Sequence, residues 1–290
     1  MERELWGALC QLAGTLYNRG CHSYYGDDLI VAVYWWAVVH DRPVSWACVA
    51  AHWPADLNRW PLPSQPTMSR RLRSSSVEEL VHAVEQHFHA LSSAAACWVL
   101  LIDAKPIVVG GPSQDADAAW GRGAGALARG YKLHAIWGGG PLPVAWALAP
   151  LNVSERRMAH ALVGDLPGEG YLLGDKQYDD AQLYDAAAAA GYQLIAPRQR
   201  AGRALGHRRQ SPHRLRSIAL LETPFGKGLY RWRIRVEHYF AHLTSFVGGL
   251  APLPFWVRRF YRVRLWVQSK LLLSAVRHLQ ISRKKALASE

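Results

Sequence analysis

The sequence predicts an α/β fold, in which a mixed β-sheet is flanked by helices and follows a helical N-terminal region. The chain has 290 residues and half of them are hydrophobic, which is enough for a full core. Residues 27–40 form an apolar block, and residues 77–91 carry apolar side chains at helical spacing. From residue 96 onward, short apolar runs typical of strands alternate with helical stretches, as in α/β proteins.

The helical region covers residues 1–95, and two short helices are predicted within it, at 45–51 and 64–73. Ser64 is a good N-cap for the second helix. Its polar and basic residues, Arg70 and Arg73 among them, suit the recognition helix of a DNA-binding helix-turn-helix. An ordinary solvated helix in an all-α region explains the same pattern equally well.

The following region has the predicted order β-β-β-α-β-α-β. The strands are expected at 97–102, 131–137, 142–148, 171–174 and 192–196, with helices at 155–166 and 181–190. The glycines at 138–140 predict a hairpin between the second and third strands. A basic connection and a helix near 231–247 come next.

The charge of the chain points to a polyanionic partner. Lys and Arg total 34 against 22 Asp and Glu, which gives a net charge of +12. Residues 195–235 concentrate this excess, with 11 Lys or Arg and one acid, Glu222. Such clustering favours nucleic acid, although a generic solubility charge is the alternative.

A membrane location and thiol chemistry are not expected. The longest apolar run, residues 29–39, is too short to span a bilayer, and acids at positions 2 and 4 do not suit a signal peptide. We therefore expect a cytoplasmic protein with no membrane partner. The four cysteines are scattered and form no CxxC pair, so zinc binding and redox work are not indicated.

Three acids are candidates for catalysis. Asp103 and Asp175 each follow a predicted strand, and if these strands are parallel neighbours both carboxylates lie at the same sheet edge. Glu237 lies in a helix whose expected core stripe is Val236, Phe240, Leu243 and Val247. Clustered carboxylates repel one another unless cations such as Mg²⁺ neutralise them, and two such ions support phosphoryl transfer. An Asp that merely caps a loop after a strand is the simpler alternative.

Basic and aromatic side chains accompany these acids. Lys105 and Lys176 follow the two Asp residues closely and could neutralise a substrate phosphate, although solvated lysines are nearly as plausible. Tyr230, Arg233 and Glu237 are spaced to share one face of a helix.

Four segments resemble bacterial insertion-sequence transposases. Residues 173–179, Leu-Gly-Asp-Lys-Gln-Tyr-Asp, resemble their DKGYD-type segment, and Tyr230, Arg233 and Glu237 have the spacing of their YREK signature. Residues 129–134 are similar to their second strand, and residues 151–155 to the segment after their third strand. The likeness covers about residues 96–250, in the strand order of a ribonuclease-H-like fold.

The resemblance implies a DDE catalytic domain at residues 96–250, with a basic helical tail at 251–290. Asp103, Asp175 and Glu237 would hold Mg²⁺, for which Mn²⁺ would substitute, and Tyr230 and Arg233 would hold DNA phosphate. The chain departs from the family at Thr244, where the signature has Lys, and at Gln177, where a small residue is usual. Loss of that Lys removes one phosphate contact and puts tight binding of the element ends in doubt.

The resemblance further implies a transposase that binds the terminal repeats of its element, cleaves there and joins the 3′ end to target DNA. It also admits a homodimer in the DNA complex. A ribonuclease-H-like nuclease without strand transfer is one alternative. A non-catalytic DNA-binding protein derived from a transposase is the other.

Overall fold

The computed structural model describes residues 1–17, 24–57, 61–93, 98–123, 125–164, 166–202, 204–205, 210–250 and 252–287, with no side-chain detail for 92 and 93. The chain forms two compact units. One joins residues 1–92 to residues 243–290, and the other comprises residues 93–242.

The second unit is built on a mixed sheet of six strands. They are β1 (Val99–Val108), β2 (Ala119–Arg122), β3 (Leu127–Trp137), β4 (Ala145–Pro150), β5 (Gly170–Leu173) and β6 (Tyr192–Ile195). Their order is β2-β3-β1-β5-β6, and β4 pairs with β3. The β1–β5 and β5–β6 pairs are parallel, whereas β3 is antiparallel to β1, β2 and β4.

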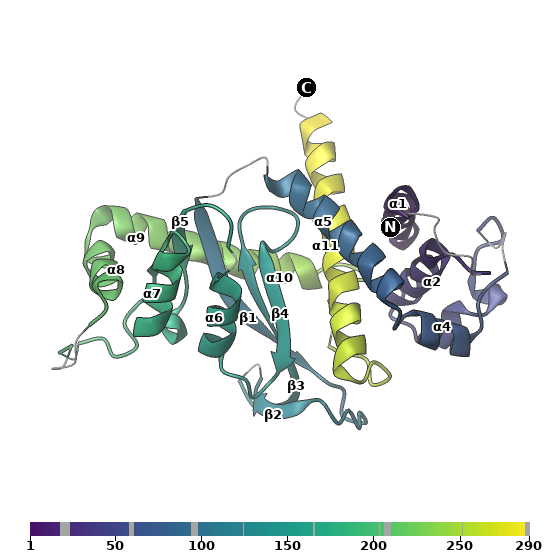
Figure 1. Cartoon of the computed structure of the whole chain (residues 1–290), viewed down its shortest axis with the longest axis horizontal. Coiled ribbons are helices and arrows are strands. Elements are labelled where there is room, and N and C mark those ends of the chain that lie inside the picture. Colours follow the sequence, from purple (N-terminus) through teal and green to yellow (C-terminus); the bar gives the residue numbers. More distant parts are fainter. Residues whose placement is uncertain are drawn as a thin grey trace. The chain divides into compact units, whose positions relative to one another are not determined.

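Helices cover both faces of this sheet (Figure 1). On one face, α6 (Glu155–Val163) and α7 (Ala181–Ala189) bury a core with alternate residues of β1, β5 and β6. On the other, the Tyr239 ring of α10 (Ile234–Thr244) stacks on Trp137 of β3, with ring centroids 4.9 Å apart. The α/β prediction is confirmed: the mixed sheet, flanked by helices and preceded by a helical region, is consistent with a ribonuclease-H-like fold.

Several boundaries differ from the sequence prediction. The first strand does not end at Asp103 but continues to Val108, because residues 103–108 pair with β3 after the β5 pairing has ended. Strand β2 was not predicted. The basic connection also contains two unpredicted helices, α8 (Pro212–Glu222) and α9 (Pro224–Tyr230).

The predicted helix around Glu237 is divided. Tyr230 ends α9, Arg233 lies in the 3-10 turn η3 (Arg231–Arg233), and Glu237 lies in α10. The expected core position of Val247 is wrong, because α10 ends at Thr244 and the Val247 side chain is 61% exposed.

The first unit is helical. Its helices are α1 (Glu2–Leu16), α2 (Asp27–Val39), α3 (Val44–Ala47), the 3-10 turn η1 (Ala50–His52), α4 (Gln65–Arg71), α5 (Ser75–Ser93) and α11 (Phe260–Leu287). Ser64 caps α4 as predicted, since its Oγ accepts a hydrogen bond from the Thr67 N–H. Along the described parts of the chain, no helix combines the length and apolar character needed to cross a bilayer.

Lys270 is a fully buried cation at the centre of α11. Its Nζ donates to the Val38 carbonyl at 2.8 Å, to the Gly248 carbonyl at 2.9 Å and to Asp41 Oδ1 at 2.6 Å. One side chain thus joins the end of α2 to the turn that precedes α11. Burial lowers the pKa of Lys270, while Asp41 opposes that shift.

We expect Lys270→Met to lower the free energy of unfolding by about 3 kcal/mol, because Met preserves the bulk but removes the Lys270 donor to the buried Gly248 carbonyl and the cation that pairs with Asp41. Urea denaturation at pH 7 measures the loss. Lys284→Met, at an exposed position of the same helix, is the matched control and should change stability by less than about 0.5 kcal/mol. If the Lys270→Met protein were as stable as the wild type, this network would make no net contribution to the free energy of unfolding.

Candidate active site

The sheet places Asp103 and Asp175 side by side along two parallel strands. Leu101 of β1 is in register with Leu173 of β5, and each Asp follows two residues later. The two strands are therefore parallel neighbours, as expected, and both carboxylates emerge where their pairing ends. This is the edge at which ligands of open α/β sheets bind.

Asp103 lies in an environment that disfavours its negative charge. Its side chain is 20% exposed, and burial is the main cause that raises its pKa to about 6. The Ala104 N–H, which donates to Oδ1 at 2.8 Å, and the Arg233 guanidinium oppose this rise, whereas the charges of Asp175 and Glu155 add to it. A cation bound beside Asp103 would therefore favour the ionised form of this half-buried carboxyl.

Arg233 connects Asp103 to the third candidate acid. Its Nη2 is 3.1 Å from Asp103 Oδ2, and its Nη1 is 3.5 Å from Glu237 Oε1. The Glu237 side chain is 64% exposed, so this carboxylate faces solvent on the same side of the sheet as Arg233. Among the residues that the structure describes, no three His, Cys, Asp or Glu side chains are gathered closely enough to hold a metal ion.

The segment after Asp175 is held by local hydrogen bonds. Asp175 caps the 3-10 turn η2 (Lys176–Tyr178), since its Oδ1 accepts from the Gln177 N–H at 2.8 Å. The Tyr230 hydroxyl donates to the Gly174 carbonyl at 3.2 Å, so the predicted phosphate-binding Tyr reaches the residue next to Asp175. These bonds fix the direction in which the Asp175 carboxylate leaves the sheet.

The remaining predicted binding residues lie in different surroundings. Lys176 is exposed beside Asp175, while the Lys105 Nζ lies 5.7 Å from the centroid of the Phe240 ring. Arg70 and Arg73 belong to the helical unit, where Arg73 donates to the Ser69 carbonyl and hydroxyl. Arg70 is exposed on α4.

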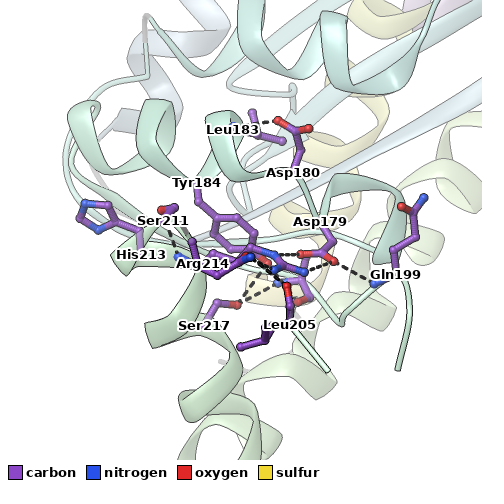
Figure 2. A network of polar contacts seen from close by, with 12 residues as sticks. Asp179, Asp180, Leu183, Tyr184, Gln199, Leu205, Ser211, His213, Arg214 and Ser217 are labelled. Atoms are coloured by element: carbon purple, nitrogen blue, oxygen red, sulfur yellow. Dashed lines mark hydrogen bonds and ion pairs between the residues drawn. The ribbon is translucent and has the colours of Figure 1, made fainter. Parts of the chain in front are cut away.

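A buried ion pair next to the site was not predicted (Figure 2). Arg214 Nε and Nη2 donate to Asp179 Oδ1 and Oδ2 at 2.7 and 2.8 Å, and the Gln199 N–H donates to Oδ2 at 2.9 Å. Burial acts to raise the pKa of Asp179, but these donors hold it below its usual value. The network anchors the end of the segment that begins at Asp175. Asp179 is the last residue of the DKGYD-like segment 173–179. Its place in that segment is the sequence feature that could have predicted its role.

Glu155 is a further acid that sequence reasoning did not assign to the site. Its Oε1 is 2.8 Å from Lys132 Nζ, and its charge raises the pKa of Asp103. It begins α6 and is the last residue of segment 151–155, which is similar to the transposases. The position of this acid in that segment is the sequence feature that could have predicted its place near the site.

The sheet, with neighbouring carboxylates where the pairing of two parallel strands ends, is consistent with the ribonuclease-H-like class. The transposase DDE domain family matches residues 97–251, which is more than half of the chain, and the chain belongs to this family. Membership implies an enzyme of the nuclease or transposase type that acts on DNA, in a family that typically uses divalent metal ions. No curated protein and no solved structure matched the chain.

Proposed function

We propose that the protein is an insertion-sequence transposase of the YREK branch, which cleaves DNA at the ends of its element and joins the freed 3′ end to target DNA. The observation that carries this proposal is the parallel register that puts Asp103 beside Asp175, with Arg233 joining Asp103 to Glu237. Family membership supports it.

The donor set fits hard divalent cations. Asp103, Asp175 and Glu237 offer carboxylate oxygens, which Mg²⁺ and Mn²⁺ prefer. Burial is the main cause of the raised pKa of Asp103, and the nearby charges of Asp175 and Glu155 add to it. When bound, two such ions activate an attacking oxygen and stabilise the leaving one in phosphoryl transfer. We propose these three residues as the metal ligands.

The other residues of the site would position the DNA. Arg233 carries the charge suited to a phosphate, and the partly buried hydrogen bond from Tyr230 to Gly174 keeps Tyr230 next to Asp175. Lys176 and Lys105 would add positive charge along the backbone of the bound strand. We further propose that residues 1–95, including Arg70 and Arg73, contribute DNA binding, and that residues 96–250 carry the chemistry.

Arg233 would couple DNA binding to metal binding. Its guanidinium already neutralises Asp103 and Glu237, so without DNA it competes with any cation for these carboxylates. A DNA phosphate would attract the same guanidinium and leave the acids free. The site would then gain its full negative charge only when substrate is present.

We expect Arg233→Ala to shift two affinities in opposite directions. Mn²⁺ binding to the free protein should tighten by roughly 5- to 10-fold, because a competing cation worth about 1 kcal/mol is removed. Binding to duplex DNA should weaken. Calorimetric titration with Mn²⁺ and gel shifts measure the two effects, and Arg235→Ala is the matched control for metal binding. Mn²⁺ affinity that falls in Arg233→Ala would contradict the competition.

The test of the function uses duplex DNA that contains the sequences flanking the coding region. The wild-type protein with Mg²⁺ should cut at the element ends, expose a 3′-hydroxyl and yield joined products when target plasmid is added. Cleavage without joining would indicate the nuclease alternative. Binding without cleavage, with either Mg²⁺ or Mn²⁺, would indicate the non-catalytic alternative and would make Thr244 a sign of decay.

Two further expectations belong to this proposal. A bacterial transposase works where the chromosome lies, so we propose a cytoplasmic location. Pairing of two element ends favours a homodimer in the DNA complex, which size measurements on the complex would detect.

A further inference from the structure

A cavity of about 170 Å³ lies within the helical unit, and its lining includes none of the three candidate carboxylates. Its walls come from the turn that leads into α3, from α4, and from the segment 256–266 at the start of α11. Gln65 and Ser69 of the predicted recognition helix thus line this cavity.

The interior of the cavity is aromatic. Tyr34 and Trp266 are buried in its lining, and Trp256 and Tyr261 add two further rings. Sites for drug-sized ligands occupy roughly 300–1,000 Å³, so a cavity of about 170 Å³ suits a single ring system. Flat aromatic walls favour a planar ligand that can stack.

The mouth of the cavity is positively charged. Arg42 and Arg262 both line it, and none of the described lining residues is acidic. Arg42 is exposed and forms no ion pair with a described residue. Arg262 donates to the Tyr261 hydroxyl at 2.7 Å and to Ser69 Oγ at 3.5 Å, so its charge is also not neutralised by a carboxylate. The positive charge of these two arginines disfavours cationic ligands. It suits a ligand that carries an anionic group.

The lining also offers hydrogen bonds that are not used within the described residues. Trp256 Nε1 is buried there without an acceptor. Gln65 and Ser45 are exposed at the mouth and can both donate and accept. A ligand with ring nitrogens or carbonyl oxygens would satisfy such groups.

We propose that this cavity receives one unstacked DNA base, with an adjacent phosphate held by Arg42 or Arg262. The aromatic lining and the single-ring size match a base, and the two arginines match the phosphate attached to it through the sugar. The inference rests on the proposed function only in taking DNA as the ligand. It concerns a site in the helical unit that takes no part in cleavage.

The test compares two single strands of equal charge, a thymidine decamer and a decamer of abasic sugar-phosphates, both labelled with fluorescein. Wild-type protein, without metal, should bind the thymidine strand more tightly by roughly 5- to 150-fold, as expected for one stacked base. Fluorescence anisotropy at low salt measures both affinities.

Ser45→Phe places a ring at the mouth of the cavity and should remove most of the preference for the thymidine strand. Because Ser45 is exposed, the substitution should leave the fold intact. Arg42→Ala should weaken binding of both strands alike, through loss of a phosphate contact. Arg3→Ala is the matched control, since Arg3 belongs to the same unit but already pairs with Asp56.

A preference for bases that persists unchanged in Ser45→Phe would overturn the inference, as would equal affinities of the wild type for the two strands. Competition by free thymidine monophosphate at the same concentration as the strand would also overturn it, in favour of a nucleotide site. Failure of the proposed function has a different signature. In that case the protein never cleaves DNA, although the metal-free preference for bases and its loss in Ser45→Phe remain.

Discussion

Asp175→Asn is expected to abolish DNA cleavage while the protein–DNA complex survives. Asn keeps the size of the side chain, and its carbonyl oxygen can still accept the Gln177 N–H that Asp175 binds at 2.8 Å. What it removes is the negative charge that would hold a divalent cation. Metal catalysis contributes several kcal/mol to such reactions, so the cleavage rate should fall roughly 10³-fold or more.

The measurements are cleavage of an end-containing duplex in Mg²⁺ and a gel shift with the same duplex. Asp180→Asn is the matched control, because it removes one charge five residues away. Asp180 caps α7 by accepting from the Leu183 N–H, and Asn caps helices equally well. Asp103→Asn and Glu237→Gln should behave like Asp175→Asn. If Asp175→Asn cleaved as fast as Asp180→Asn, the three-carboxylate proposal would fail.

Asp103→Asn should also stabilise the metal-free protein. The folded-state pKa of Asp103 is raised to about 6 from 3.8, so its contribution to stability is lost as the pH rises through 6. At pH 7 the charged form therefore costs stability, and Asn should recover up to about 3 kcal/mol. Urea denaturation should show a larger gain at pH 7 than at pH 4.5, because the unfolded carboxyl, with its lower pKa of 3.8, ionises first as the pH rises. A gain that is equal at both pH values would contradict the burial of this charge.

The strands around the two Asp residues could be predicted because their local signals agree with their tertiary role. Residues 99–102 are apolar without interruption and are buried between helices on both faces. Strand β2 was missed because Ala119–Arg122 is short, alternates between partial and full exposure, and contains a glycine. Its existence depends on pairing with β3, which no local pattern encodes.

The end of α10 shows a signal that was present but not used. Gly248 adopts φ +88 and is followed by Gly249, and such a pair commonly terminates a helix. Helix α10 already ends at Thr244, before the turn that contains these glycines, so Val247 lies outside the helix. The helical spacing of apolar residues, used alone, extended the predicted helix to Val247, beyond its end at Thr244.

The partners of Arg233 could not be predicted from spacing. Its contact with Glu237 is local, at i and i+4, but its contact with Asp103 joins residues 130 positions apart. Sequence reasoning assigned Arg233 to DNA phosphate, and that role stays a prediction. Because Arg233 contacts two of the acids, it would compete with a metal ion for them. Only the fold reveals this competition.

Binding of duplex DNA is expected to weaken steeply with salt, through the basic segment 195–235. Arg200, Arg216, Lys227, Arg231 and Arg235 are exposed there and form no ion pair with a described acid. Each phosphate contact contributes about −0.9 to the slope of log affinity against log salt. Five contacts give a slope of about −4.5, which is roughly a 500-fold loss between about 50 and 200 mM salt.

The segment can be tested separately from the rest of the net charge of +12. Arg200→Ala combined with Arg216→Ala should make the slope shallower by about 2, because two counterion-releasing contacts are lost. Arg3→Ala removes a charge that Asp56 already neutralises, and should leave the slope unchanged. Gel shifts across the salt range measure all three proteins. If the double variant and the wild type have the same slope, Arg200 and Arg216 do not contact phosphate. The charge of this segment would then serve solubility.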